Sequence, residues 1–168
     1  MTAPATAQRK VPVGIGRLAV SRDPAEVLVA YGLGSCVGIT IFDPEGRLSG
    51  MAHVLLPASD GRAPGPREPA RFADSAVDAL LKHFIEAGSV KRRLIVKIAG
   101  GGSVLGSANA QKFKIGERNA EAIRERLRHH GISLVNSELG GVKGRTLEMY
   151  VASGKTFVRT ATSPATEL

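Results

Sequence analysis

The chain has 168 residues, the length of one compact domain. Its hydrophobic content of 43% and charged content of 23% exclude a disordered chain, a collagen-like chain and a disulfide-rich scaffold. Lysine and arginine outnumber aspartate and glutamate by 23 to 15, and this net charge of +8 favours anionic partners. The basic residues are scattered, and only five Phe and two Tyr are present without any Trp, so we expect no nucleic-acid binding.

The cysteine content and the hydropathy pattern narrow the class further. The single cysteine, Cys36, excludes an intramolecular disulfide and a multi-cysteine zinc site, and we expect no metal and no cofactor. The N-terminus lacks the apolar stretch of a secretory signal. The longest uncharged run, residues 27–42, is interrupted by glycines and falls short of the roughly 18–20 apolar residues of a spanning helix. We therefore expect a cytoplasmic protein without membrane insertion.

The first half of the chain predicts strands followed by one helix. Short β-branched or apolar segments between turn residues predict strands over 11–20, 27–31, 37–42 and 48–55. A loop rich in proline and glycine follows over 58–71. Apolar residues at helical spacing from Val77 to Ile85 then predict a helix, which Gly88 ends.

The second half adds one helix and the remaining strands. A strand over 94–99 enters the Gly100–Gly102 turn, and an apolar stripe through Ala120, Ile123 and Leu127 predicts a helix over 116–130. Further strands are expected over 132–138, 146–151 and 156–160. We expect flexible tails over 1–10 and 161–168 and a single domain over 11–160. About eight strands and two helices without βαβ alternation predict an α+β fold, with mixed or antiparallel sheets flanked by the two helices.

A hairpin between the strands 37–42 and 48–55 carries the candidate chemistry. Asp43-Pro-Glu-Gly46 is typical of a four-residue loop, and pairing Phe42 with Arg47 places Cys36 directly opposite His53. A thiol facing an imidazole is a nucleophile–base pair, and a cationic His53 would activate the thiol. The alternative interpretation is a buried cysteine that packs as a small hydrophobic residue.

Several segments resemble one known family over residues 11 to 160. They are Leu33-Gly-Ser-Cys-Val-Gly38 with Asp43-Pro44, Met51-Ala-His-Val-Leu-Leu-Pro57, Lys97-Ile-Ala-Gly-Gly101, Ile115-Gly-Glu-Arg-Asn119 and Leu139-Gly-Gly141. Together they resemble the chemoreceptor glutamine deamidases (CheD). The resemblance implies a fold like that of a toxin deamidase and a cytoplasmic chemotaxis enzyme of bacteria or archaea. Such an enzyme hydrolyses glutamine side chains of methyl-accepting chemoreceptors to glutamate, and the family often pairs with the chemotaxis phosphatase CheC.

Carried over to this chain, the resemblance makes Cys36 the nucleophile and His53 the base of a reaction through a thioester. We expect the backbone N–H groups of Ser35 and Cys36 to stabilise the oxyanion. The following loop is expected to form part of the substrate groove, with a plain turn as the alternative: Gly100, Gly101, Gly102 and Ser103.

One position departs from the family pattern. The family places a threonine six residues before the cysteine, where its hydroxyl orients the histidine, and this chain has Ala30 there. Thr40, Ser49, a backbone carbonyl or water are the candidate substitutes, and the missing hydroxyl predicts that Ala30→Thr raises turnover about tenfold. The departure keeps open an alternative function, a low-turnover or inactive binding regulator of chemoreceptors or of CheC. A third, weaker alternative is another amide or ester hydrolysis.

Overall fold

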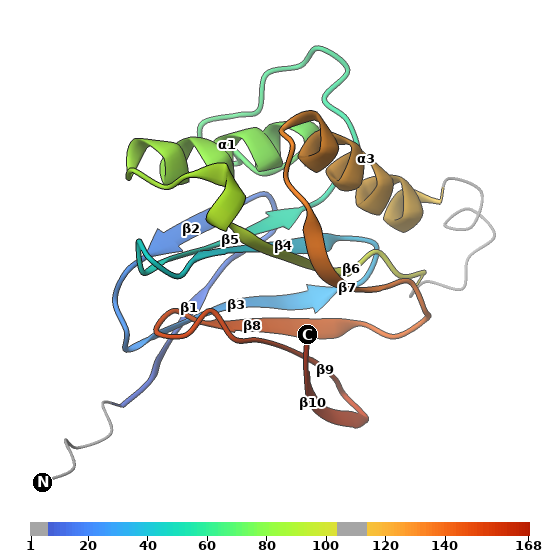
Figure 1. The fold of residues 1–168 in the computed structure, drawn as a ribbon. Coiled ribbons are helices and arrows are strands. Elements are labelled where there is room, and N and C mark those ends of the chain that lie inside the picture. Colours follow the sequence, from blue (N-terminus) through green and yellow to red (C-terminus); the bar gives the residue numbers. More distant parts are fainter. Residues whose placement is uncertain (1–6, 104–113) are drawn as a thin grey trace, which may run out of the picture.

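Two stacked sheets and a layer of helices make up the molecule (Figure 1). The computed structural model describes residues 7–103 and 114–168. In these residues one five-stranded sheet, which we call the outer sheet, has the order β1-β3-β8-β9-β10. The other, the inner sheet, has the order β2-β5-β4-β6-β7 and lies between the outer sheet and the helices. The expected α+β architecture with two main helices is confirmed.

The elements have the following bounds in chain order. They are β1 (Arg9–Pro12), β2 (Leu18–Ser21), β3 (Glu26–Leu33), β4 (Val37–Asp43), β5 (Leu48–Val54), α1 (Ala73–Glu86), the short 3₁₀ helix η1 (Lys91–Arg93), β6 (Ile95–Gly100), α3 (Ile115–His129), β7 (Leu134–Leu139), β8 (Arg145–Tyr150), β9 (Thr156–Thr160) and β10 (Ser163–Glu167). Both sheets are mixed, because β1 pairs with β3 in parallel and β6 pairs with β7 in parallel, while their other pairs are antiparallel.

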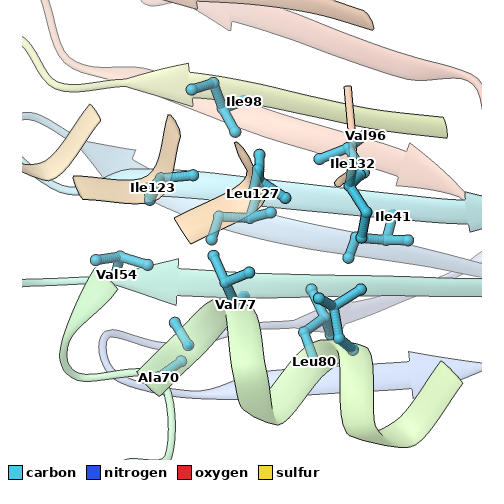
Figure 2. Close-up of a cluster of buried hydrophobic side chains, with 14 of the residues drawn as sticks. Ile41, Val54, Ala70, Val77, Leu80, Val96, Ile98, Ile123, Leu127 and Ile132 are labelled. Atoms are coloured by element: carbon cyan, nitrogen blue, oxygen red, sulfur yellow. The ribbon is translucent and has the colours of Figure 1, made fainter. Parts of the chain in front are cut away.

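The helices cover the inner sheet with the apolar stripes that the sequence predicts. Val77, Leu80 and Phe84 of α1 are fully buried against strand residues such as Ile41. Figure 2 shows this cluster, in which Ile123 and Leu127 of α3 lie over the same sheet. Ile85, expected on the stripe, is instead 46% exposed. In the described ranges no helix combines the length and the apolar character that crossing a membrane requires.

A second core lies between the two sheets, and a glycine sets their approach. The core contains Leu28, Leu33, Met51, Leu147 and Met149. At Gly38, in the centre of the inner sheet, a Cβ atom would come within 2.5 Å of Leu147 Cδ2 on the outer sheet. The sheets therefore pack closely at this point because Gly38 has no side chain.

Two segments differ from the expected elements. The expected strand 11–20 is divided into β1 and β2, which belong to different sheets, because the chain crosses between them at Gly14–Gly16. The expected tail 161–168 instead contains β10, which pairs with β9. Of the expected N-terminal tail, residues 1–6 lie outside the described residues, while Arg9 and Lys10 belong to β1.

Candidate active site

The β4–β5 hairpin brings Cys36 and His53 to the same end of the inner sheet. Cys36 directly precedes β4, and His53 is the penultimate residue of β5. His53 pairs with Gly38 rather than with Cys36, so the register predicted from the sequence is wrong by two residues. Side chains alternate between the faces with a period of two, so a shift of two leaves both residues on the expected face, toward the outer sheet. The two positions are diagonal neighbours rather than direct partners.

The register error has its cause in the hairpin loop. Asp43 Oδ1 accepts hydrogen bonds from the N–H groups of Glu45 at 3.2 Å and Gly46 at 3.1 Å. Arg47 adopts the left-handed conformation with φ of 47°, and the last strand pair is Asp43 with Leu48. The loop therefore spans residues 44–47, one residue later than predicted.

His53 is almost fully buried, and one of its nitrogens is tied to the backbone. Nδ1 lies 3.1 Å from the carbonyl oxygen of Val13, in the segment between β1 and β2. A carbonyl only accepts, so Nδ1 carries the proton and Nε2 has the free lone pair. Among the residues that the structure describes, Nε2 has no hydrogen-bond partner. Burial lowers the pKa of His53 below 6.5, against a smaller opposite effect of the Val13 hydrogen bond.

Cys36 is also buried, with 7% of its surface exposed. Burial raises the pKa of its thiol above 9.0, and the residue's own backbone N–H counteracts this only in part. Burial favours the neutral form of both groups, whereas the sequence-based expectation was a cationic His53 beside a thiolate. A base must remove the thiol proton during the reaction.

Cys36 opens onto a pocket of about 740 Å³ whose walls are mostly glycine. Its lining residues are Gly32, Gly34, Ser35, Cys36, Gly101, Gly102, Ser103, Lys114, Ile115, Gly116, Glu117, Gly140 and Gly141. Of the expected groove, Gly101, Gly102 and Ser103 line the pocket. Gly100 is not a lining residue, but a Cβ atom there would meet Cys36 O at 2.2 Å, so the loop rests directly on the Cys36 backbone.

The hydroxyl groups considered as substitutes for the missing threonine are occupied elsewhere. Thr40 Oγ1 donates to Lys97 O at 3.3 Å, and Ser49 Oγ donates to Val151 O at 3.1 Å. Ala30 is fully buried in β3, within the same inter-sheet core as Cys36. The remaining substitute that the protein itself could supply is a backbone carbonyl. This is what the structure shows, because Val13 O accepts a hydrogen bond from His53 Nδ1.

Sequence reasoning missed two walls of the pocket. One is the Gly140–Gly141 turn after β7, and the other is the start of α3 at Lys114–Glu117. The N–H groups of the first turn of a helix have no intrahelical partner and carry partial positive charge, which suits a pocket for an oxyanion. The glycine pair and Gly116 were the available signals. In the ranges 7–103 and 114–168, no three His, Cys, Asp or Glu side chains form a group that could hold a metal ion.

Comparison with known proteins gives a consistent family. The family model described as CheD chemotactic sensory transduction matches residues 55–160, more than half of the chain. The probable chemoreceptor glutamine deamidase CheD of Symbiobacterium thermophilum is 42% identical over 154 residues, which cover 91% of this chain and 93% of that protein. The chain belongs to the CheD family. The chemoreceptor glutamine deamidase CheD of Thermotoga maritima is 39% identical over 150 residues, covering 89% of this chain and 91% of that CheD.

A match of such coverage necessarily includes the hairpin that carries Cys36 and His53, which lies outside the stretch matched by the CheD family model. Among solved structures, YlmD from Geobacillus stearothermophilus is similar in fold, with a TM-score of 0.50 at 14% identity. This likeness covers 78% of the CheD chain described here and 58% of YlmD.

Proposed function

We propose that this CheD protein is a cysteine-dependent deamidase of glutamine side chains in methyl-accepting chemoreceptors. Cys36 is the nucleophile and His53 the general base. The observation that carries the proposal is the state of the pair: the chain's one thiol lines the pocket, and the imidazole has Nδ1 held and Nε2 free. The names of relatives about 40% identical over most of the chain support the substrate class.

The reaction begins when the Cys36 thiol gives its proton to His53 Nε2 in concert with the attack of its sulfur. The sulfur attacks the carboxamide carbon, and the carbonyl oxygen becomes an oxyanion. When this intermediate collapses, the C–N bond breaks and the imidazolium gives its proton to the departing ammonia. Water then attacks the thioester while His53 accepts a proton from it, which releases glutamate and restores the thiol. In sum, one carboxamide and one water become one carboxylic acid and ammonia.

The oxyanion donors are the backbone N–H groups of Ser35 and Cys36. Among the described residues neither group donates a hydrogen bond to another residue, and both residues line the pocket. The Cys36 N–H belongs to the residue that carries the attacking sulfur, so it is close to the carbon under attack. The absence of side chains on Gly101, Gly102, Gly140 and Gly141 leaves room for a glutamine side chain to enter.

We place the reaction in the cytoplasm, at the cytoplasmic domains of chemoreceptors, with the phosphatase CheC as a second partner. The family resemblance supports both statements.

Mass spectrometry of a chemoreceptor cytoplasmic fragment incubated with the chain tests the proposal. We expect a gain of about 1 Da at individual glutamines together with ammonia release. Cys36→Ala should abolish both while the fold remains intact, because it removes a small side chain and the nucleophile at once. Receptor that is bound but unchanged in mass would instead support the binding regulator. Turnover of other amides or esters without receptor modification would support the third alternative.

A further inference from the structure

Asn119 of α3 is a fully buried polar side chain that contacts the backbone on both sides of the candidate site. Its Nδ2 donates to Ser35 O at 2.9 Å and to Leu55 O at 3.1 Å. Ser35 immediately precedes Cys36, and Leu55 follows His53 by two residues. One amide group therefore holds the backbone next to both members of the pair.

The hydrogen bond to Ser35 has a consequence for the next N–H group. The described residues contain no cis peptide bond, and in a trans peptide the C=O and the following N–H point in opposite directions. Fixing Ser35 O toward the Asn119 amide therefore turns the Cys36 N–H away from Asn119. The neighbouring peptides are fixed as well, since Gly102 N–H donates to Gly34 O at 2.7 Å and Gly101 N–H donates to Cys36 O at 2.8 Å.

The close approach of α3 makes this contact possible. A Cβ atom at Gly116 would lie 2.3 Å from Gly101 O, so the helix backbone rests directly on the loop that holds Cys36. Only a glycine at this point lets α3 come near enough for Asn119 to reach Ser35. The next turns of the helix pack with the aliphatic side chains of Ile123 and Leu127.

Packing alone does not account for an asparagine at this position. Within the described part of the chain its Oδ1 has no hydrogen-bond partner, although the residue is 0% exposed. Burying an unsatisfied amide oxygen is unfavourable, and an aliphatic residue would avoid this cost. The retained polar group therefore points to a need for its two donors.

We propose that Asn119 is a positioning residue that orients the Ser35–Cys36 peptide, so that the Cys36 N–H is directed at the oxyanion. The inference rests on the proposed deamidase function, in which an oxyanion forms at this pocket. Asn119 acts through the backbone of Cys36 and does not itself contact the substrate.

The test compares two reactions of the Cys36 thiol in Asn119→Leu. Acylation by p-nitrophenyl acetate passes through a tetrahedral oxyanion, whereas alkylation by iodoacetamide does not. Loss of one oxyanion donor lowers turnover by about 10²–10³-fold, and a misdirected donor should cost at least about tenfold. We expect acylation, and kcat for receptor deamidation, to fall by about tenfold or more, with alkylation within about twofold of wild type. KM for the receptor should change little.

Leu127→Ala is the matched control, because it weakens the packing of the same helix without touching Ser35. Its ratio of acylation to alkylation should equal that of wild type. Asn119→Ser, which keeps one donor on a smaller side chain, replaces Asn119→Leu if that variant fails to fold. Its ratio of acylation to alkylation should fall less than that of Asn119→Leu.

An equal fall of acylation and alkylation, or no change in acylation, would overturn the role of Asn119. The two proposals fail separately. If wild type acylates at Cys36 but leaves receptor glutamines unchanged, the deamidase function is wrong, while the ratio still decides the role of Asn119 at the thiol.

Discussion

At the scale of single residues, the candidate pair rests in its neutral form. Burial raises the thiol pKa of Cys36 above 9.0 and lowers that of His53 below 6.5, so neither group is charged near pH 7. Transferring the proton before substrate arrives would create two buried charges, which is unfavourable. The proton transfer is therefore coupled to attack on the carboxamide, when the oxyanion donors receive the developing charge.

This state of His53 predicts the acid limb of the pH profile. The base works only when Nε2 is unprotonated, and burial extends the neutral form to lower pH. As pH falls, kcat/KM for deamidation should decline with a midpoint below pH 6.5. Initial rates of ammonia release between pH 4.5 and 8 give this midpoint, because the range extends about two pH units around the ordinary histidine pKa. A midpoint above 6.5 would show that a neighbouring group stabilises the cationic form of His53. It would contradict a resting state in which Cys36 and His53 are both neutral.

The tie between His53 and Val13 changes the expectation for Ala30. A hydroxyl at position 30 was expected to orient the imidazole, but Val13 O already holds Nδ1 at 3.1 Å. We therefore expect Ala30→Thr to change turnover by less than about threefold, since the tautomer and the ring are already fixed. The added atoms enter a fully buried position and should reduce the free energy of unfolding by about 1–3 kcal/mol. A tenfold gain in steady-state ammonia release would show that the carbonyl alone does not orient His53.

At the scale of elements, an ion pair holds the loop that sets the hairpin register. The Asp43 carboxylate, with 0% side-chain exposure, accepts hydrogen bonds from Arg93 Nε at 3.1 Å and Nη2 at 2.9 Å. Burial alone would raise the pKa of Asp43, but the hydrogen bonds from Arg93 and the Gly46 N–H outweigh it and lower the pKa to about 2. Arg93 belongs to η1, so this pair connects the loop to the segment that leads into β6.

The pair predicts a pH-dependent loss of stability in Arg93→Met. A lowered carboxyl pKa stabilises the folded chain fully above 3.8, and this contribution disappears as pH falls from 3.8 to about 2. The shift corresponds to about 2 kcal/mol. Arg93→Met should lower the free energy of unfolding by at least that amount at pH 7, because it also leaves a buried carboxylate unpaired. Urea unfolding should show the difference from wild type shrinking below pH 3.8, and a difference independent of pH would contradict the assignment.

The sequence predicts the strands of the site better than it predicts their pairing register. The alternation of apolar residues identified β4 and β5 and the faces of both, because side-chain period is a local property. The register depended on Arg47 adopting a left-handed conformation and on where the Asp43 side chain bonds, and neither is encoded in hydropathy. For the same reason β10 was not predicted, since its residues are all exposed and carry no apolar period.

At the scale of the whole molecule, the site lies where the two sheets approach each other. Val13, which holds His53, lies on the path from β1 in the outer sheet to β2 in the inner sheet. Gly38, which pairs with His53, packs so closely against the outer sheet that a Cβ atom there would lie 2.5 Å from Leu147 Cδ2. The orientation of the base therefore depends on how the two sheets stack.

Gly38→Ala tests the contact between the two sheets at this point. The new methyl group would lie 2.5 Å from Leu147 Cδ2, so Gly38→Ala should lower the free energy of unfolding by about 1–3 kcal/mol. Leu147→Ala alone should also destabilise the fold, by about 2–5 kcal/mol, through the cavity it creates. In the double variant the methyl fills part of that cavity, so urea unfolding should give a total at least about 1 kcal/mol smaller than the sum. Additive effects would place the contact elsewhere.

The groups that complete the site come from distant segments, which limited what sequence patterns could reveal. Cys36 and His53 share one hairpin and were found from its strand pattern. The Val13 carbonyl is a backbone atom that every residue type possesses, so no residue identity marks it. Asn119 lies 83 positions after Cys36, and it reaches the site only because α3 packs against a glycine loop.

The glycine walls of the pocket also affect how the entropic cost of substrate binding is divided between the protein and the substrate. Glycine has no side-chain rotamers to lose, so ligand binding immobilises no protein side chain along the glycine walls. A larger share of the ordering penalty then falls on the incoming glutamine and the segment that presents it. A glutamine displayed on an already rigid scaffold meets less of this penalty than one in a flexible peptide. The glycine walls therefore favour glutamines that a well-ordered surface presents.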